Sequence, residues 1–133
     1  MVIDTSALLA IFFAEPERRP FLEIILQTDR RLISAANALE TGIVLEAKRG
    51  EPAGREFDLF VVRAALQIVP VDAEQVEIAR SAWRNYGKGR HSAALNFGDC
   101  FAYALAKSTG EPLLAKGGDF ATTDIEMCPP QTT

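Results

Sequence analysis

The chain has 133 residues, of which 48% are hydrophobic and 24% are charged, a composition that excludes an intrinsically disordered chain. Its net charge of -4 excludes a protein that coats nucleic acid through overall positive charge, so any contact with RNA or DNA must be local. No apolar run approaches the roughly 20 residues that span a bilayer, so we expect a cytoplasmic protein without membrane contact. Cys100 and Cys128 form neither a disulfide framework nor a zinc spacing. We expect a single domain over residues 1–133.

The first residues predict a strand that leads directly into a helix. Val2 and Ile3 are β-branched, and the apolar residues from Leu8 to Phe13 recur at helical spacing. Asp4 lies between the two elements, where its side chain can cap the helix by accepting a backbone N–H. It also follows a strand, at the edge of an open α/β sheet where ligands bind. Both roles are open for Asp4, and neither excludes the other.

The rest of the chain alternates predicted helices with short apolar strands. Helices are expected at about 15–27, 35–49, 52–66, 73–86 and 97–107, and strands at 31–33, 67–71, 112–115 and 125–128. Helix caps are expected at Ser34, Asp72 and Asn96, and helix ends at Gly50 and Gly110. This alternation is typical of an α/β fold in which helices cover both faces of a parallel sheet.

Glu40 is a candidate functional residue within the predicted helix 35–49. It shares a helix face with Ala36, Ile43 and Ala47, at spacings of three and four residues. Because burying an unpaired carboxylate is costly, Glu40 must border a cleft, meet a cation or point away to reach water. The sequence leaves a functional role and a solvated boundary position equally open.

Asp99 is the only acid of the predicted helix 97–107, which is apolar nearly all round and is expected to be central and buried. Interaction with the helix dipole contributes about 0.3–1 kcal/mol, too little to explain burial of a carboxylate. Gly98 beside it leaves room for another group to approach the backbone, although it is equally compatible with close helix packing.

A fourth acid, Asp119, follows the predicted strand 112–115 and therefore reaches the same sheet edge as Asp4. Asp124 lies close behind it, and either residue is alternatively a turn or cap residue.

One explanation covers all four acids, namely that Asp4, Glu40, Asp99 and Asp119 converge in the folded chain. Two like charges about 4 Å apart repel by roughly 4 kcal/mol at an effective dielectric near 20. No basic residue adjoins any of the four in the sequence, so Mg²⁺ or Mn²⁺ is the expected counter-ion. Such an ion lowers the pKa of bound water and stabilises charge on a phosphate, which is the chemistry of phosphodiester hydrolysis.

Positive charge gathers around the glycine-punctuated segment 87–92, which we expect to be a surface loop. Arg84, Lys88 and Arg90, together with Lys116, are candidates to hold the phosphates of single-stranded RNA or an RNA loop. The alternative is a solvated loop without a ligand, and His91 is more simply explained as a loop residue than as a general base.

Four segments, in their order and spacing, resemble PIN-domain ribonucleases, and specifically the VapC toxins of bacterial VapBC toxin–antitoxin pairs. They are residues 4–8 (DTSAL), 38–40 (ALE), 96–106 (NFGDCFAYALA) and 113–125 (LLAKGGDFATTDI). The resemblance implies a three-layer α/β/α PIN fold with a short central parallel sheet and an endoribonuclease that depends on Mg²⁺ or Mn²⁺. It further implies cleavage of cellular RNA that stops translation until a cognate VapB-type antitoxin binds, and a homodimer formed through helical faces.

By motif, Asp4 and Asp99 match the principal metal-binding acids of that family. Glu40 matches the acid carried on a helix, and Asp119 matches the last acid of the four. Thr5 or Ser6 would add a hydroxyl group to the same network. The chain departs from the commonest family pattern at Ala115 and Gly118, which makes Asp124 a further candidate beside Asp119.

Two other functions compete with the nuclease. A phosphotransferase that uses Asp4 as its nucleophile would need a second acid two residues on, where this chain has Ser6. A receiver-like regulatory module would bind a metal in the acidic pocket without turnover, and nothing in the sequence removes it.

Overall fold

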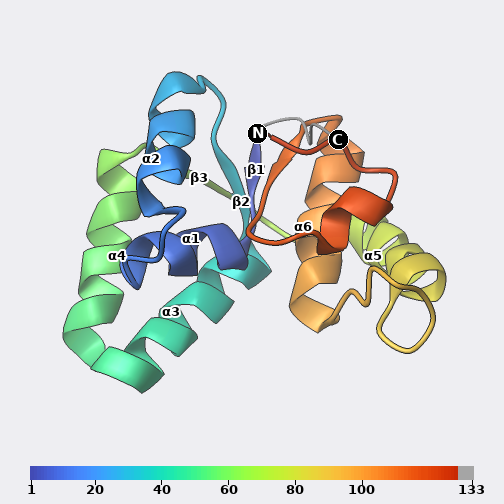
Figure 1. Cartoon of the computed structure of the whole chain (residues 1–133), viewed down its shortest axis with the longest axis horizontal. Coiled ribbons are helices and arrows are strands. Elements are labelled where there is room, and N and C mark those ends of the chain that lie inside the picture. Colours follow the sequence, from blue (N-terminus) through green and yellow to red (C-terminus); the bar gives the residue numbers. More distant parts are fainter. Residues whose placement is uncertain (129–133) are drawn as a thin grey trace.

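Four short parallel strands form the middle layer of the computed structural model, which describes residues 1–128 (Figure 1). The strands are β1 (Val2–Ile3), β2 (Leu32–Ser34), β3 (Gln67–Val69) and β4 (Leu113–Leu114), in the spatial order β3-β2-β1-β4. Val2 of β1 is in register with Leu32 on one side and with Leu113 on the other. The carboxyl ends of β1, β2 and β4 therefore meet at one edge of the sheet.

Helices cover both faces of this sheet. They are α1 (Thr5–Phe12), α2 (Arg18–Gln27), α3 (Ala35–Arg49), α4 (Glu51–Arg63), α5 (Ala73–Tyr86) and α6 (Phe97–Thr109), followed by a short 3-10 helix, η1 (Asp119–Thr122). Figure 1 shows α1 to α4 on one side of the strands and α5 and α6 on the other. The prediction of a three-layer α/β/α domain is thereby confirmed. No helix within residues 1–128 is long and apolar enough to cross a membrane.

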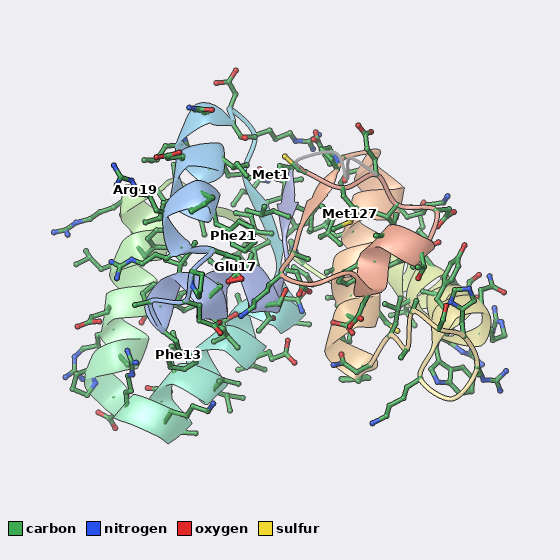
Figure 2. All side chains as sticks on the ribbon, viewed as in Figure 1. Met1, Phe13, Glu17, Arg19, Phe21 and Met127 are labelled. Atoms are coloured by element: carbon green, nitrogen blue, oxygen red, sulfur yellow. The ribbon has the colours of Figure 1, made fainter. Side chains whose placement is uncertain are left out.

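Strands β1, β2 and β4 each supply side chains to two separate apolar cores, because successive side chains of a strand point to opposite faces. Ile3 and Leu114 pack in the core beneath α1 to α4, whereas Val2 and Leu113 pack in the core beneath α5 and α6. Figure 2 shows Phe21 directed from α2 toward the first core, with Met127 on the opposite side of the sheet. These three strands therefore have an apolar core on each side, whereas Gln67 and Ile68 of the edge strand β3 are exposed.

Three predicted helix starts are confirmed by their hydrogen bonds. Ser34, Asp72 and Asn96 each accept a backbone N–H from the first turn of α3, α5 and α6. Gly50 and Gly110 end α3 and α6 with φ of 80° and 72°, a left-handed conformation that favours glycine. These local signals place both ends of α3 where the sequence predicts them.

Three other predicted boundaries are wrong. The helix expected over 52–66 ends at Arg63, because the backbone turns at Ala65, which has a φ of 52°. The strand expected over 67–71 ends at Val69, since Pro70 has no N–H to continue the ladder. The fifth strand expected over 125–128 reduces to one isolated bridge between Leu113 and Met127, because β4 is only two residues long and offers no longer partner.

The buried face of α3 also differs from the prediction. Asn37, Thr41 and Leu45 face the interior, whereas Ile43 is 55% exposed and Ala47 lies in solvent. Hydrogen bonds offset part of the cost of burying the two polar residues: the Thr41 hydroxyl donates to the Asn37 backbone carbonyl at 2.8 Å, and the Asn37 amide N–H donates to the Gly98 carbonyl at 3.0 Å. Glu40 consequently lies at the margin of the helix interface rather than within an apolar stripe.

Candidate metal centre

Asp4 lies at the carboxyl end of β1 and caps α1. Its Oδ2 accepts the backbone N–H of Ser6 at 3.0 Å, which confirms the predicted cap. The residue is only 2% exposed, and its Oδ1 is buried without a hydrogen-bond partner within residues 1–128. Buried polar atoms nearly always have a partner, so this oxygen marks a position that a ligand would complete.

Burial raises the pKa of Asp4, the hydrogen bonds from Ser6 oppose this, and the charges of Asp99 and Glu40 add to the rise, so that the pKa is about 7. Removal from water disfavours the charged form of the carboxyl group, and the neighbouring like charges disfavour it as well. A cation beside Asp4 would lower this pKa, because it favours the charged carboxylate against both burial and the neighbouring acids.

Glu40 projects from α3 toward the amino-terminal end of α6. Its Oε1 accepts the Thr5 hydroxyl at 2.5 Å and, more weakly, the Asn37 amide at 3.4 Å. The half-buried side chain borders a groove of about 270 Å³ that Phe97 and Phe101 also line. Of the roles left open by the sequence, the structure therefore places Glu40 at the border of a cleft.

Asp99 lies in the first turn of α6 and forms a capping box with Asn96. Its Oδ2 accepts the Asn96 backbone N–H at 3.0 Å, and the Asn96 side chain accepts the Asp99 N–H at 2.9 Å. Burial raises the pKa of Asp99, the bond from Asn96 opposes this, and the charges of Asp119 and Glu40 raise it further. The helix cap thus accounts for the hydrogen bond of Asp99 Oδ2, whereas the charges of Asp119 and Glu40 disfavour a negative charge on this carboxylate.

Asp119 is the exposed first residue of η1 and is close enough to Asp99 to raise its pKa. Asp4, Glu40 and Asp99 influence one another as well, so Asp99 is the acid that all the others approach. None of the four forms an ion pair with another described residue. Over residues 1–128, however, no three Asp, Glu, His or Cys side chains are already spaced to enclose an ion.

The three inner acids share one pattern of bonding. Asp4, Glu40 and Asp99 each use one carboxylate oxygen to accept a bond from the fold, and no described residue donates to the second oxygen. The bonded oxygens fix the side chains, whereas the others are available to a ligand. Three carboxylate oxygens of this kind are donors that suit Mg²⁺ or Mn²⁺, so the residues present fit a hard divalent cation.

Asp124 is not part of this group. Its carboxylate accepts the Tyr103 hydroxyl and the Lys107 ammonium, both at 2.6 Å. Partial burial would raise the pKa of Asp124, but the bonds from Lys107 and Tyr103 outweigh it and lower the pKa. Asp119 therefore remains the fourth candidate acid, and Asp124 stabilises the packing of α6 against the segment that follows η1.

The four candidate RNA-binding cations have different surroundings. The Lys116 ammonium lies 2.7 Å from Glu15 and 3.6 Å from Glu17, two acids whose role the sequence did not indicate. Figure 2 places Glu17 near the carboxyl edge of the sheet. The Arg90 guanidinium stacks 4.1 Å from the ring centre of Trp83, while Arg84 and Lys88 are exposed and form no ion pair with a described residue.

The sequence did not identify Asn37 as part of the site. This residue is fully buried and connects α3 to α6, since its amide donates to the Gly98 carbonyl at 3.0 Å. A signal was present, because Asn37 lies one turn before Glu40 on the same helix. The room left by Gly98, noted in the sequence, is occupied by the Glu40 carboxylate.

Several known proteins resemble this chain over nearly its whole length. The family model described as PIN domain matches residues 1–126. Ribonuclease VapC30 of Mycobacterium tuberculosis is 55% identical over 125 residues, which cover 94% of this chain and 95% of that protein. Ribonuclease VapC of Mycolicibacterium smegmatis is 54% identical, with 94% and 97% covered. The crystal structure of Mycobacterium tuberculosis VapC20, described as a sarcin-ricin loop cleaving toxin, has a TM-score of 0.75 at 19% identity, with 93% and 95% covered.

Proposed function

The chain belongs to the PIN-domain family and, within it, to the VapC ribonucleases, and on this premise we propose that Asp4, Glu40, Asp99 and Asp119 form the active site of a toxin endoribonuclease. The observation that carries the assignment is Asp4, whose buried carboxylate has an unpartnered oxygen and faces two further acids. Left alone, such a group destabilises the fold, so its presence is explained by what it binds.

We propose that Asp4, Glu40 and Asp99 hold Mg²⁺ or Mn²⁺, with Asp119 at the outer side. The ion, when bound, supplies a more acidic water and stabilises negative charge on the scissile phosphate. The protein's contribution is orientation: Ser6, Thr5 and Asn96 each fix one oxygen of an acid. Because these donors belong to helix starts and adjacent helices, the acids are arranged before substrate arrives.

The proposed substrate is single-stranded RNA or an RNA loop, held by Arg84, Lys88 and Arg90, with Lys116 as a weaker contributor. Arg84, Lys88 and Arg90 lie at the end of α5 and in the following loop, exposed and close in sequence. Phosphate contacts of this type make binding depend on salt concentration. Lys116 is already held by Glu15 and Glu17, which would compete with phosphate.

We further propose that a cognate VapB-type antitoxin inhibits the enzyme, in the cytoplasm where its RNA substrate is found. Two structural neighbours are a toxin–antitoxin complex from Klebsiella pneumoniae (18% identity, TM-score 0.69) and VapBC2 from Rickettsia felis bound to a DNA fragment from their promoter (12% identity, TM-score 0.70). The matches cover 92% of this chain and 92% of the first neighbour, and 90% and 89% for the second. A basic antitoxin segment would complement the unpaired acids described above.

A homodimer is the proposed state of the toxin, formed through an apolar face that α3, α5 and α6 share. Phe97 is 82% exposed, and Leu39 and Ile43 are 65% and 55% exposed. Beside them, Trp83 and Val76 line a groove of about 580 Å³. Contiguous apolar surface of this kind is typical of an interface, and sedimentation of wild type against Phe97→Glu tests it: the variant should be monomeric.

The function is tested with purified protein and an end-labelled RNA in the presence of Mg²⁺. Strand scission that EDTA abolishes and added Mg²⁺ restores supports the endoribonuclease. Binding of metal without scission of any RNA in a total-RNA digest would instead support the alternative, a non-catalytic receiver-like module. Mapping the cleavage sites in that digest would identify the RNA.

A further inference from the structure

Gly98 lies directly against the carboxylate of Glu40. A Cβ atom added at Gly98 would lie 2.5 Å from Glu40 Oε2 and 2.7 Å from Oε1, much closer than atoms can approach without bonding. Gly98 does not have a positive φ, so its backbone conformation is open to other residues. Glycine within a helix is disfavoured relative to alanine. The space that Glu40 occupies is therefore the physical reason for glycine at this position.

Asn37 holds the same contact from the other side. Its buried amide donates to the Gly98 carbonyl at 3.0 Å and to Glu40 Oε1 at 3.4 Å, so that one side chain connects the backbone of α6 with the acid of α3. Gly98 immediately precedes Asp99, and Asn37 lies one turn before Glu40. The contact thus joins the two helices at the points from which their acids project.

We propose that Asn37 and Gly98 are positioning residues that set the separation between the carboxylates of Glu40 and Asp99, and thereby the affinity of the site for a divalent cation. This inference rests on the proposed function, because it assumes that the acids hold a metal. Neither residue is an acid or a base, and neither needs to touch RNA. Their effect is to permit a close approach of Glu40 and to keep it from swinging into the adjacent groove.

The first test is a titration of the purified protein with Mn²⁺ alone. Gly98→Ala should weaken Mn²⁺ binding about tenfold to a hundredfold, the range seen when residues that orient metal ligands are changed. The melting temperature of the metal-free variant should not fall, because Glu40 can turn toward the groove. Gly42→Ala is the matched control, since Gly42 is also in a helix and a Cβ there meets no atom within 4 Å. It should bind Mn²⁺ as the wild type does.

A second substitution separates spacing from general damage. Glu40→Asp shortens the side chain by one methylene, which lets the carboxylate clear the added methyl group at position 98. Gly98→Ala should therefore weaken Mn²⁺ binding much less in the Glu40→Asp background than in the wild type. An equal loss in both backgrounds would overturn the proposal.

Asn37 is tested against an equally buried neighbour. Asn37→Ala should weaken Mn²⁺ binding several-fold, whereas Thr41→Val, which removes a buried hydroxyl that does not contact Glu40, should alter only the melting temperature. Failure of the wild type to bind Mn²⁺, or wild-type affinity in both Gly98→Ala and Asn37→Ala, would refute the inference. Mn²⁺ binding that responds as described, without RNA scission, would refute the proposed function and leave the inference standing.

Discussion

The two edges of the central sheet treat acidic side chains in opposite ways. At the amino-terminal edge, Glu111 accepts the Met1 ammonium at 2.7 Å and Arg30 at 2.9 Å. The bond from the Met1 ammonium leads the effects that lower the pKa of Glu111. At the carboxyl edge, Asp4 has no cation among the described residues, and burial raises its pKa to about 7.

Acids at the amino-terminal edge therefore stabilise the folded state, whereas acids at the carboxyl edge lower its stability. An acid bound by cations contributes to folding, whereas a buried acid surrounded by like charges opposes folding until a cation arrives. The same layer of the protein thus carries a structural edge and a binding edge. Substitutions at Glu111 and Asp4 should therefore affect different properties.

The largest expected effect is on catalysis. Asp4→Asn keeps the shape of the side chain and removes its charge, and should lower RNA cleavage by about 10²–10³-fold, the range for removing one group that stabilises transition-state charge. Asp99→Asn should behave likewise. Glu111→Gln, assayed at the same Mg²⁺ concentration below its melting temperature, should cleave at the wild-type rate. Equal cleavage by all four proteins would remove the catalytic assignment.

The next effect is on the stability of the metal-free protein as a function of pH. The pKa of Asp4 is higher in the folded chain, at about 7, than the ordinary 3.8 of an unfolded one, so the folded state binds a proton that the unfolded state lacks. Lowering the pH from 7.5 to 5.5 should then raise the free energy of unfolding by about 2 kcal/mol. Denaturant unfolding in EDTA measures this. Most of the gain should be lost in Asp4→Asn, where only the contribution of Asp99, whose pKa is also raised, remains. An undiminished gain in that variant would contradict the assignment to Asp4.

A smaller effect is expected at the structural edge. Glu111→Gln should lower the free energy of unfolding by about 1 kcal/mol at neutral pH, because two ion pairs are lost at a partly buried site. The pKa of Glu111 is lowered in the folded state, so its contribution should disappear as the pH falls through that lowered pKa. Lowering the pH should therefore reduce the stabilisation by Glu111, whereas it increases the stabilisation by Asp4. If the two contributions changed in the same direction with pH, the contrast between the edges would be contradicted.

The smallest effect concerns Lys116, which pairs with Glu15 and Glu17 near the carboxyl edge of the sheet. Because Glu15 and Glu17 already hold its ammonium, Lys116→Met should change the KM for RNA by no more than about twofold to threefold. Lys88→Met is the comparison, since the Lys88 side chain forms no ion pair with a described residue. Its KM for RNA should rise more than that of Lys116→Met and should depend less steeply on salt concentration than the wild-type KM, because a phosphate contact is lost. A larger loss from Lys116→Met would show that RNA displaces Glu15 and Glu17.

Much of the fold follows from local signals in the sequence. Ser34 and Gly50 determine the two ends of α3 because each satisfies backbone groups within a few residues of itself. The strand at 125–128 could not be judged in this way, since its length depends on how much of β4 remains available as a partner. The face of α3 was mispredicted for a related reason: Asn37 and Thr41 are buried because of bonds that the pattern of apolar residues does not reveal.

The sequence predicts which acids form the candidate site, but it does not predict how their side chains are arranged. Asp4, Glu40 and Asp99 stand out because each is locally unexplained, and the structure brings them within electrostatic range of one another. Their spacing depends on Asn37, Gly98 and Thr5, whose contacts join segments more than thirty residues apart. The pairing of Asp124 with Tyr103 and Lys107 depends in the same way on how α6 lies against the chain that follows it.

The order of the strands has a consequence for the point during synthesis at which the enzyme is complete. Of the four described strands, β1 is synthesised first and β4 last, and the two pair in the sheet. A nascent chain that ends before α6 carries Asp4 and Glu40 but lacks Asp99, Asp119 and one of the two neighbours of β1. A chain synthesised only as far as α5 therefore lacks part of the proposed active site, so the nuclease cannot be active before α6 and η1 have been made.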